Sequence, residues 1–485
     1  MKSPDTEQDL MPPATRSRAA ERAVAPAGTG VAMKKILFIA YHFPPAGGGG
    51  VQRSLKFVKY LPEAGYLPIV LTIEAPDGRR WTPKDQALMD EVPAGVEIHR
   101  VSIPDEVHTP GKLERAAREL LGLRSRFGRT WMERAIEAGT RIAEQEKPDL
   151  IFVTMSPFDG ADAAAEISRR TGIPWVADLR DPWALDEFQL HRTGLHRELE
   201  KAQMERSLES AALVIMNTPE SARRVRETMP RIDPAKVVSL TNGYDAEDFS
   251  GEVPPIGGGK FNIVHSGYFH AEQGLMERSR QRQYQLLGRT IPGVERLPRS
   301  HYYLLQALEQ WLKEAPEIAN EVRMHCVGVL SKADQALIDA SPAKELFVCS
   351  GYLSHAECLR FVRGADLLFL PMHKMPAGMK AGLVPGKTYE YMAAGRPVVA
   401  TLPESDARDF LTQAGTGVFS APGDVHGLLA ALKAQHAKWK TGGRSCDWNG
   451  EFVRQFERKN LTARLAEFLT QVRRDTSLPP ILNAG

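Results

Sequence analysis

A lysine and a glutamate stand three residues apart in GLVPGKTYEYMAAGRPVVA, residues 382–400. The pattern predicts a loop, a short helix over 387–394, a glycine stop and an apolar strand. Lys387 at the helix start can bind a phosphate, because the free N–H groups and the helix dipole there also favour an anion. Glu390 lies about one turn further on the same face, where its carboxylate can accept both hydrogen bonds of a ribose diol. The alternative is an ordinary Lys–Glu helix pair, which contributes only a few tenths of a kcal/mol.

A run of four glycines lies in HFPPAGGGGVQR, residues 42–53, directly after the first predicted strand. Backbone N–H groups of such a loop can approach a ligand closely, and the helix that follows favours negative charge at its start. A diphosphate or its attached sugar suits this environment, and a flexible turn is the alternative. The spacing is not G-x-G-x-x-G, so it does not predict a nicotinamide or flavin site. Ligands of open α/β sheets bind at the carboxyl ends of strands, which favours a binding role for Gly47, Gly48, Gly49 and Gly50.

Three charged residues cluster in VADLRDPW, residues 176–183, where the chain leaves another strand of the same half. Asp178, Arg180 and Asp181 can orient an acceptor hydroxyl or stabilise charge, and we predict catalytic roles for them. Alternatively, Arg180 pairs with an aspartate and only holds the loop in place.

Two weaker features lie after strands of the second half. HSGYF (265–269) places Gly267 at a point of close backbone approach. SGYLSHAE (350–357) places Tyr352 and Leu353 where a nucleotide base can lie against backbone groups. Each feature alone is more typical of structure than of function.

The elements that position these residues alternate between short apolar runs and longer amphipathic stretches. The first half predicts strands at 36–41, 68–73, 96–101, 149–154, 174–179, 213–218 and 237–242, with helices such as 52–63 and 199–212 between them. The second half predicts strands at 261–267, 322–329, 346–353, 366–372, 396–402 and 417–421. Several runs are almost continuously apolar, which is typical of parallel strands buried on both faces. The pattern predicts two doubly wound α/β sheets with a ligand cleft between them.

The Gly/Pro-rich segment GEVPPIGGGK, where the pattern restarts, predicts the division of the chain. We predict an N-terminal extension (1–32), a Rossmann-like domain (33–250), a linker (251–260), a second Rossmann-like domain (261–450), a terminal helix (451–474) and a tail (475–485). The terminal helix can dock on either domain, including by crossing back to the first. The extension lacks the apolar core of a secretory signal, its composition predicts disorder, and Met33 is a candidate start residue.

The composition fits a soluble globular protein: 485 residues, 42% hydrophobic and 25% charged. A formal net charge of +2 gives no reason to expect binding to nucleic acid. The four cysteines share no metal-type spacing and fit reduced thiols, so we predict no metal site. The sequence has no run of about 18 apolar residues, so we predict no transmembrane helix. We therefore expect a cytoplasmic protein.

Two segments interrupt the regular pattern. Residues 112–134 hold seven Lys/Arg against three Glu, with Leu and Trp131 interleaved. This stretch is either a solvated helical face or a basic amphipathic helix that contacts an anionic membrane surface. Residues 272–300 hold six Arg against three Glu and are expected to form an inserted mobile loop.

These motifs resemble bacterial glycosyltransferases of family 4, the glycosyl transferases group 1. The resemblance rests on HFPPAGGGGVQRSLKFVKYLPEAGYLPIVLT, TNGYDAEDF and KTYEYMAAGRPVVAT, and it covers about residues 33–470. It implies a GT-B fold, in which the first domain binds the acceptor and the second binds a nucleoside diphosphate sugar linked to UDP or GDP. It also implies retention of anomeric configuration, without a cofactor or an essential metal.

By position, the resemblance implies that Glu390 holds the ribose and that Lys387 and the amides of 384–386 hold the diphosphate. The glycine loop faces the donor sugar from the other domain, and the charged residues of 176–183 lie near the acceptor. The donor-binding residues predicted in this way are Gly47, Gly48, Gly49, Gly50, Gly267, Arg299, Tyr352, Leu353, Val384, Pro385, Gly386, Lys387 and Glu390.

Two positions depart from the family pattern. Gly382 stands where many members carry a second glutamate, so the carboxylate that contacts the sugar is missing or comes from elsewhere. Backbone amides are one substitute. The insertion 272–300 displaces the basic residue that binds phosphate after the first strand of the second domain, and we assign that role to Arg299.

The sequence thus predicts a retaining glycosyltransferase of cell-surface polysaccharide or glycolipid assembly. Its acceptor is expected to be a saccharide or a lipid-linked saccharide. The segment 112–134 is then expected to hold the enzyme at the inner face of the plasma membrane. One alternative is a sugar-nucleotide epimerase or hydrolase of similar plan. Another is a catalytically inactive subunit that binds a nucleotide sugar, for which Gly382 is the main support.

Overall fold

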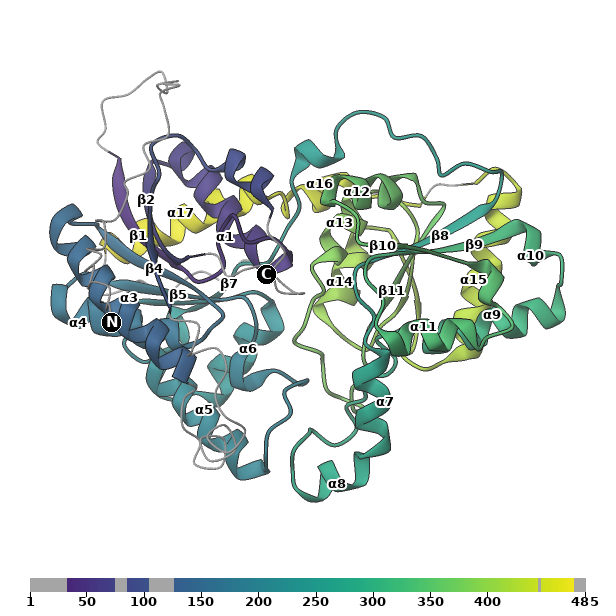
Figure 1. Ribbon diagram of the computed structural model, residues 1–485, viewed down its shortest axis with the longest axis horizontal. Coiled ribbons are helices and arrows are strands. Elements are labelled where there is room, and N and C mark those ends of the chain that lie inside the picture. The colour runs from purple at the N-terminus through teal and green to yellow at the C-terminus, as the bar shows by residue number, and fades with distance from the viewer. Residues whose placement is uncertain (1–32, 75–84, 104–125, 444–445, 475–485) are drawn as a thin grey trace, which may run out of the picture.

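A computed structural model describes residues 33–74, 85–103, 126–443 and 446–474. The chain forms two α/β domains side by side, each with helices on both faces of a parallel sheet (Figure 1). The predicted fold class, two doubly wound Rossmann-like domains, is therefore confirmed.

In the described part of the chain, the N-terminal domain is built on a seven-stranded parallel sheet in the order β3-β2-β1-β4-β5-β6-β7. The strands are β1 (Lys34–Ala40), β2 (Tyr66–Ile73), β3 (Glu97–Val101), β4 (Leu150–Met155), β5 (Trp175–Leu179), β6 (Leu213–Met216) and β7 (Val237–Ser239). The helices are α1 (Gly49–Tyr60), α3 (Arg126–Glu146), α4 (Asp159–Thr171), α5 (Gly194–Leu208) and α6 (Pro219–Thr228). Each strand overlaps a predicted run.

Over 261–443, the described C-terminal domain has a six-stranded parallel sheet in the order β10-β9-β8-β11-β12-β13. The strands are β8 (Phe261–Ser266), β9 (Val322–Val327), β10 (Phe347–Gly351), β11 (Leu367–Pro371), β12 (Val398–Thr401) and β13 (Gly417–Ser420). The helices are α7 (Ala271–Ser279), α8 (Gln281–Leu286), α9 (Tyr302–Glu314), α10 (Ile318–Glu321), α11 (Lys332–Asp339), α12 (His355–Gly364), α13 (Lys387–Ala393), α14 (Asp406–Gln413) and α15 (Val425–Lys440). These strands also match the predicted runs.

Both faces of each sheet are covered, which explains the apolar runs. Along β1, Ile36 and Phe38 pack into one apolar cluster, while Leu37 and Ile39 pack into another. Side chains of a strand alternate between the two faces of its sheet. A strand buried on both faces therefore needs apolar residues at nearly every position.

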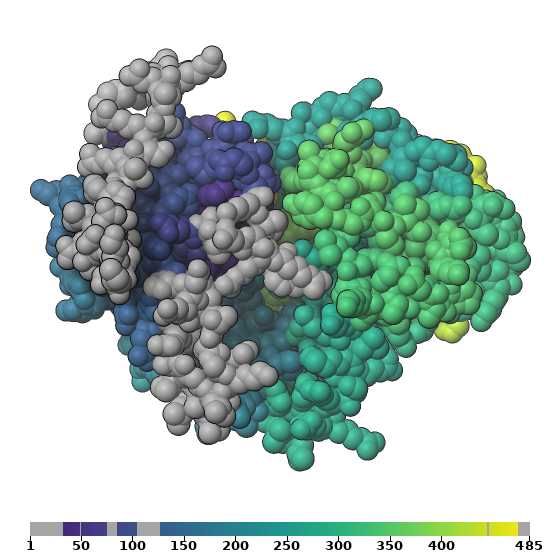
Figure 2. Space-filling model, in the orientation of Figure 1, coloured from purple at the N-terminus to yellow at the C-terminus, as the bar shows by residue number. Residues whose placement is uncertain are grey.

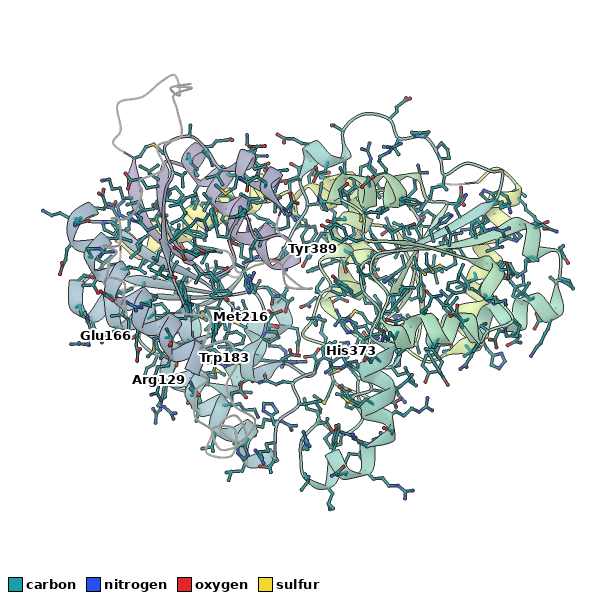
Figure 3. All side chains as sticks on the ribbon, viewed as in Figure 1. Arg129, Glu166, Trp183, Met216, His373 and Tyr389 are labelled. Carbon is teal, nitrogen blue, oxygen red and sulfur yellow. The ribbon has the colours of Figure 1, made fainter. Side chains whose placement is uncertain are left out.

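The end of the chain crosses from one domain to the other. The single helix expected over 451–474 is wrong, because α16 (Gly450–Arg454) and α17 (Arg458–Arg474) are separate. Phe456, between them, packs with Tyr389 in the C-terminal core, where Figure 3 labels Tyr389. Leu461 and Leu465 of α17 pack in the N-terminal core. The apolar side chains of this stretch thus pack into two different cores, and the helix is interrupted where the chain passes from one core to the other.

The mobile loop expected at 272–300 is wrong for about the first half of that segment, since α7 and α8 occupy 271–286. The insertion reaches the N-terminal domain through backbone hydrogen bonds. The N–H of His191 donates to the carbonyl of Arg289, and the N–H of Gly194 donates to the carbonyl of Leu287, each at 3.0 Å. The insertion is therefore a structured contact between the domains.

The predicted basic segment 112–134 is described only in part, because residues 112–125 lie outside the described residues. The remainder opens α3, where Trp131 is 1% exposed and belongs to the apolar core. Its indole is therefore not available to contact a membrane. Among the helices of the described residues, none is both long enough and apolar enough to span a membrane.

Candidate active site

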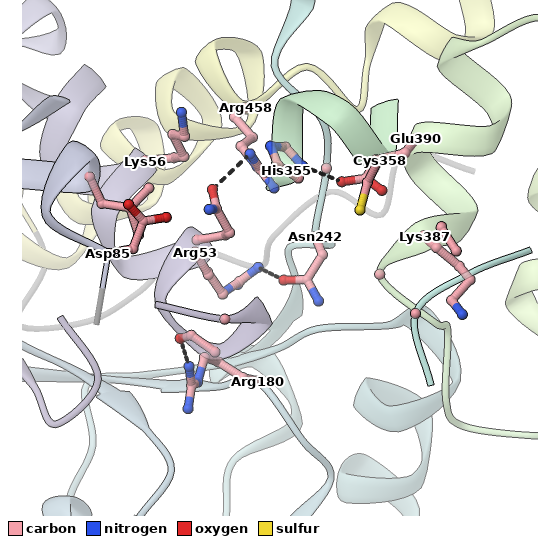
Figure 4. Close-up of a pocket in the computed structure, with 18 of the residues that line it drawn as sticks. Arg53, Lys56, Asp85, Arg180, Asn242, His355, Cys358, Lys387, Glu390 and Arg458 are labelled. Carbon is pink, nitrogen blue, oxygen red and sulfur yellow. Dashed lines mark hydrogen bonds and ion pairs between the residues drawn. The ribbon is translucent and has the colours of Figure 1, made fainter. Parts of the chain in front are cut away.

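A cavity of about 520 Å³ lies between the two domains (Figure 4). Residues of α1 and 241–243 line one side, and the end of β8 and the starts of α12 and α13 line the other. The sequence-predicted residues that line it are Gly48, Gly50, Arg180, Asp181, Gly267, Tyr352, Leu353, Gly386, Lys387 and Glu390. Gly47, Asp178, Arg299, Val384 and Pro385 are not lining residues, and Gly49 is the first residue of α1.

Lys387 is the first residue of α13, and a buried histidine of β8 fixes its ammonium group. Lys387 Nζ donates to His265 Nε2 at 3.0 Å. His265 Nδ1 donates to the carbonyl oxygen of Phe369 at 3.0 Å, so Nε2 is left as an acceptor. Burial and the nearby ammonium hold the pKa of His265 well below its usual value. The lysine thus meets a neutral ring.

Lys387 has a second cation, Arg299, close to it at this end of the cavity. Burial, together with the charge of Arg299, lowers the pKa of Lys387 to about 7. Burial lowers the pKa of Arg299 to about 10, and its guanidinium lies over the Phe188 ring at 5.1 Å. A diphosphate beside Lys387 would favour the charged form of both groups, because opposite charge raises the pKa of a base. The electrostatics therefore favour an anion here, although Arg299 lies behind the cavity wall.

Gly267 makes room for the lysine. Its φ of +93° is in the region that favours glycine, and a Cβ built there would lie 3.1 Å from Lys387 Nζ. A side chain at this position would strain the backbone and displace the ammonium group.

Glu390 lies on the next turn of α13, within hydrogen-bond reach of His355. His355 Nε2 donates to Glu390 Oε1 at 3.0 Å. Burial alone would raise the pKa of Glu390, but the His355 hydrogen bond and the charges of His355 and Arg458 outweigh it and lower the pKa. The carboxylate is therefore ionised and ready to accept hydrogen bonds.

Sequence reasoning missed His355 and Arg458 as cavity residues. His355 stands in the quoted segment 350–357, directly after the helix-capping residue Ser354, so its place at a helix start was a usable signal. Arg458 opens α17, and nothing local predicts that this helix reaches the cavity. Tyr352 and Leu353, which precede α12, line the cavity next to His355, and Tyr352 is 62% exposed.

The glycine loop meets the loop after β5 across the cavity floor. Gly48, with a φ of +91°, precedes α1. Arg180 donates to the carbonyl of Gly50 and, through Nε, to the carbonyl of Met155 at 2.9 Å. Arg180 therefore ties the two loops together through backbone carbonyls while it also lines the cavity.

Asp178 is fully buried beneath this floor rather than exposed to an acceptor. Its carboxylate accepts hydrogen bonds from Arg53 Nη2 at 2.6 Å and from Thr154 Oγ1 at 2.7 Å. Arg53 in turn donates to the carbonyls of Thr241 and Leu240, both at 2.8 Å, at the end of the N-terminal domain. The structure thus places Asp178 where it positions Arg53, and it does not place this aspartate at the acceptor side of the cleft.

Replacing Asp178 with asparagine is expected to lower the free energy of unfolding by about 3 kcal/mol, because Arg53 stays buried without its counter-charge. Urea denaturation measures the effect. The matched control is Asp181→Asn at the exposed neighbour, which should change stability by less than about 0.5 kcal/mol. Equal stability of the two variants would contradict the buried-pair interpretation.

Gly382 is packed between the domains. Its N–H donates to Glu187 Oε1 at 3.0 Å, and its carbonyl accepts from the hydroxyls of Thr218 at 2.8 Å and Ser221 at 2.9 Å. A Cβ at this position would lie 2.9 Å from an Arg224 nitrogen. The amide of Gly382 is therefore occupied and cannot substitute for the missing glutamate, and Glu187 is itself buried.

Glu187 holds this interdomain contact together. His373 of the C-terminal domain, labelled in Figure 3, and Arg224 of α6 both contact its carboxylate, with nitrogen to oxygen distances of 3.2 and 2.8 Å. Burial would raise the pKa of Glu187, but these two partners outweigh it and lower the pKa to about 2. The Glu187 carboxylate thus stays ionised over the whole physiological range.

Nucleoside diphosphate affinity is expected to fall roughly fivefold between about pH 7 and about pH 8, because Lys387, with a pKa of about 7, loses its positive charge over this range. The phosphates themselves are already ionised in this range. Isothermal titration calorimetry across pH measures the effect. In Lys387→Arg the cation persists, so the profile should be flat. A wild-type profile equally flat would contradict the role of this ammonium.

Two family models match most of the chain. Residues 48–243 match the glycosyl transferase 4-like domain, and residues 294–436 match glycosyl transferases group 1. A curated relative, the glycogen synthase of Mycobacterium tuberculosis, is 23% identical over 407 residues, which are 82% of this chain and 85% of that protein.

Solved structures show the same architecture. The sucrose-phosphate synthase of Thermosynechococcus elongatus has a TM-score of 0.62 at 14% identity and covers 90% of this chain and 99% of its own. Anabaena HepE, solved in complex with UDP and glucose, has a TM-score of 0.53 at 14% identity over the same shares. The family resemblance predicted from the motifs is confirmed. The chain belongs to the GT-B glycosyltransferases, with a glycosyl transferase 4-like domain followed by a group 1 domain.

Proposed function

We propose that this protein transfers a glycosyl unit from a nucleoside diphosphate sugar to an acceptor hydroxyl, with retention of anomeric configuration. The observation that carries the proposal is the pair on α13. Lys387 offers a cation beside a second cation, and one turn away Glu390 offers an ionised acceptor. This spacing suits a diphosphate next to a ribose diol. HepE, of similar fold, was solved with UDP, which favours UDP among the donors to test first.

In the proposed reaction, the bond between the anomeric carbon and the diphosphate breaks while the acceptor oxygen bonds to the same face of that carbon. The acceptor's proton passes to the departing phosphate oxygen. Lys387 stabilises the charge that develops on the diphosphate, which is usually the largest catalytic contribution at such sites. His265 keeps the ammonium in place, and contact between the domains excludes water that would hydrolyse the donor.

We propose that the reaction needs no metal and no cofactor. Within the described residues, no group of three or more His, Cys, Asp or Glu side chains is arranged to hold a metal ion. Activity should therefore survive dialysis against EDTA. The proposed acceptor is a saccharide or lipid-linked saccharide of the cell surface, and contact of 112–134 with the inner face of the plasma membrane stays part of this proposal.

A thermal-shift screen against UDP, GDP and their sugars tests donor binding. A ligand that binds only the folded protein at about 100 times its Kd stabilises it by about 2.7 kcal/mol. UDP or GDP should raise the Tm, whereas uridine or guanosine should do so much less. If no nucleoside diphosphate raises the Tm, the proposed donor class is wrong.

Product analysis with and without acceptors then separates three enzyme classes. A transferase needs an acceptor for release of the nucleoside diphosphate. An epimerase or hydrolase converts the donor alone, and mass spectrometry would show this. A subunit that has lost catalysis would bind the donor without turnover on any acceptor tested.

A further inference from the structure

Four exposed leucines lie near the point where the two domains touch through the insertion. Leu195 and Leu199 lie one turn apart on α5, 68% and 52% exposed, and Leu286 and Leu287 end α8, 87% and 42% exposed. Within the described residues, these are the leucines that stand out as exposed. They gather because the N–H of Gly194 donates to the carbonyl of Leu287 at 3.0 Å.

The contact that joins them is tight and spans both domains. Arg197 Nη2 donates to the carbonyl of Gly288 at 3.2 Å, and the amide nitrogen of Gly194 lies 3.0 Å from where a Cβ of Gly288 would stand. Figure 1 shows α5 and α8 at the same end of the molecule, and the insertion projects from the lower edge of the C-terminal domain in Figure 2. The leucines therefore form one surface only while the domains touch here.

Positive charge lies on the insertion, close in the chain to Leu286 and Leu287. Arg278, Arg280 and Arg282 are exposed, and none of them pairs with a carboxylate among the described residues. From 278 to 294 the sequence has four arginines and no acidic residue. Protruding leucines beside unpaired arginines suit the boundary between acyl chains and anionic headgroups.

We propose that Leu195, Leu199, Leu286 and Leu287, flanked by these arginines, form a docking surface for an anionic lipid membrane. A second copy of the chain fits less well, because four side chains cover far less than the roughly 800 Å² per partner of a stable protein interface. The surface is distinct from the buried Trp131 region and from the donor cavity. Since it needs both domains, docking also favours the arrangement in which they touch.

Co-sedimentation with vesicles tests the proposal. The wild-type chain should bind vesicles that contain phosphatidylglycerol and not vesicles of phosphatidylcholine alone. The double variant Leu286→Ser/Leu287→Ser should lose at least tenfold in partitioning, because both side chains are exposed and the fold does not need them. Val348→Ser, an exposed apolar position on β10, is the matched control and should bind as the wild type does.

A second arm tests the charges and the alternatives. Arg280→Gln/Arg282→Gln should bind at least tenfold more weakly, and salt should no longer affect its binding strongly. The proposal is overturned if the wild type ignores anionic vesicles, or if the leucine variant binds unchanged. It is also overturned if only substitutions at 112–118 abolish binding, or if sedimentation velocity shows a dimer that the leucine variant loses while vesicles stay unbound.

Discussion

Lys387→Met is expected to lower kcat by about 10²–10³-fold, the effect of removing one preorganised group that stabilises developing negative charge. Methionine keeps the length and the apolar stem of the side chain but has no charge. The loss should be at least as large in kcat/KM as in kcat, because Lys387 binds the diphosphate and the interaction strengthens as the diphosphate departs. Initial rates of nucleoside diphosphate release, measured over a range of donor concentrations, give both constants.

Two further variants locate the cause of that loss. Lys387→Arg keeps the cation and should retain more activity than the methionine variant. His265→Leu leaves the lysine in place but removes the acceptor at 3.0 Å that positions it. Its kcat should fall less than that of the methionine variant, and its pH profile should change. A methionine variant that keeps full kcat would show that Lys387 does not serve the leaving group.

Glu390→Gln is expected to raise the Kd for a nucleoside diphosphate by about 100-fold, because hydrogen bonds to a charged group contribute about 1.5–3 kcal/mol each. Glutamine keeps the shape of the side chain and loses the charge that a ribose diol and His355 both need. Titration calorimetry with UDP and GDP measures the change. The exposed Glu404→Gln is the control and should bind as the wild type does.

The same variant also tests His355. In the wild type, the hydrogen bond to Glu390 raises the pKa of His355, so His355 stays protonated to a higher pH. In Glu390→Gln that support is absent, and the pKa of His355, followed by NMR, should fall. Unchanged nucleotide affinity in Glu390→Gln would remove this residue from the donor site.

The sheets could be predicted because their strands are buried on both faces. In β1, Phe38 and Ile39 face opposite sides and are both apolar, so the run is visible without any knowledge of its neighbours. The helix at Lys387 was visible for a similar local reason, since a loop, a short helix and a glycine stop follow one another directly. Local order in the sequence thus predicted these elements.

The burial of individual site residues could not be predicted in the same way. Asp178 looked like a cleft residue because it stands at the end of a predicted strand, in a cluster with Arg180 and Asp181. It is buried because it pairs with Arg53, which lies 125 residues away in the chain. Nothing near Asp178 in the sequence indicates that partner. The role of Gly382 in packing the domains together also depends on residues of another domain, Thr218 and Ser221.

The passage of the chain from the C-terminal domain back to the N-terminal domain was the other source of error in the predicted elements. The stretch that includes Phe456 and Leu461 has apolar residues at helical spacing, which predicted one helix. The two side chains belong to different cores, and a pattern of spacing cannot show that. Arg458, at the start of α17, enters the cavity for the same reason.

The most direct test of the central claim is titration calorimetry of UDP, GDP and the matching nucleosides into the wild type and two variants. The wild type should bind one diphosphate much more tightly than its nucleoside. Lys387→Met should lose most of that difference, and Glu390→Gln should weaken the diphosphate and the nucleoside alike. Equal affinities for nucleoside and diphosphate in the wild type, or variants that bind both as the wild type does, would contradict a nucleoside diphosphate site at α13.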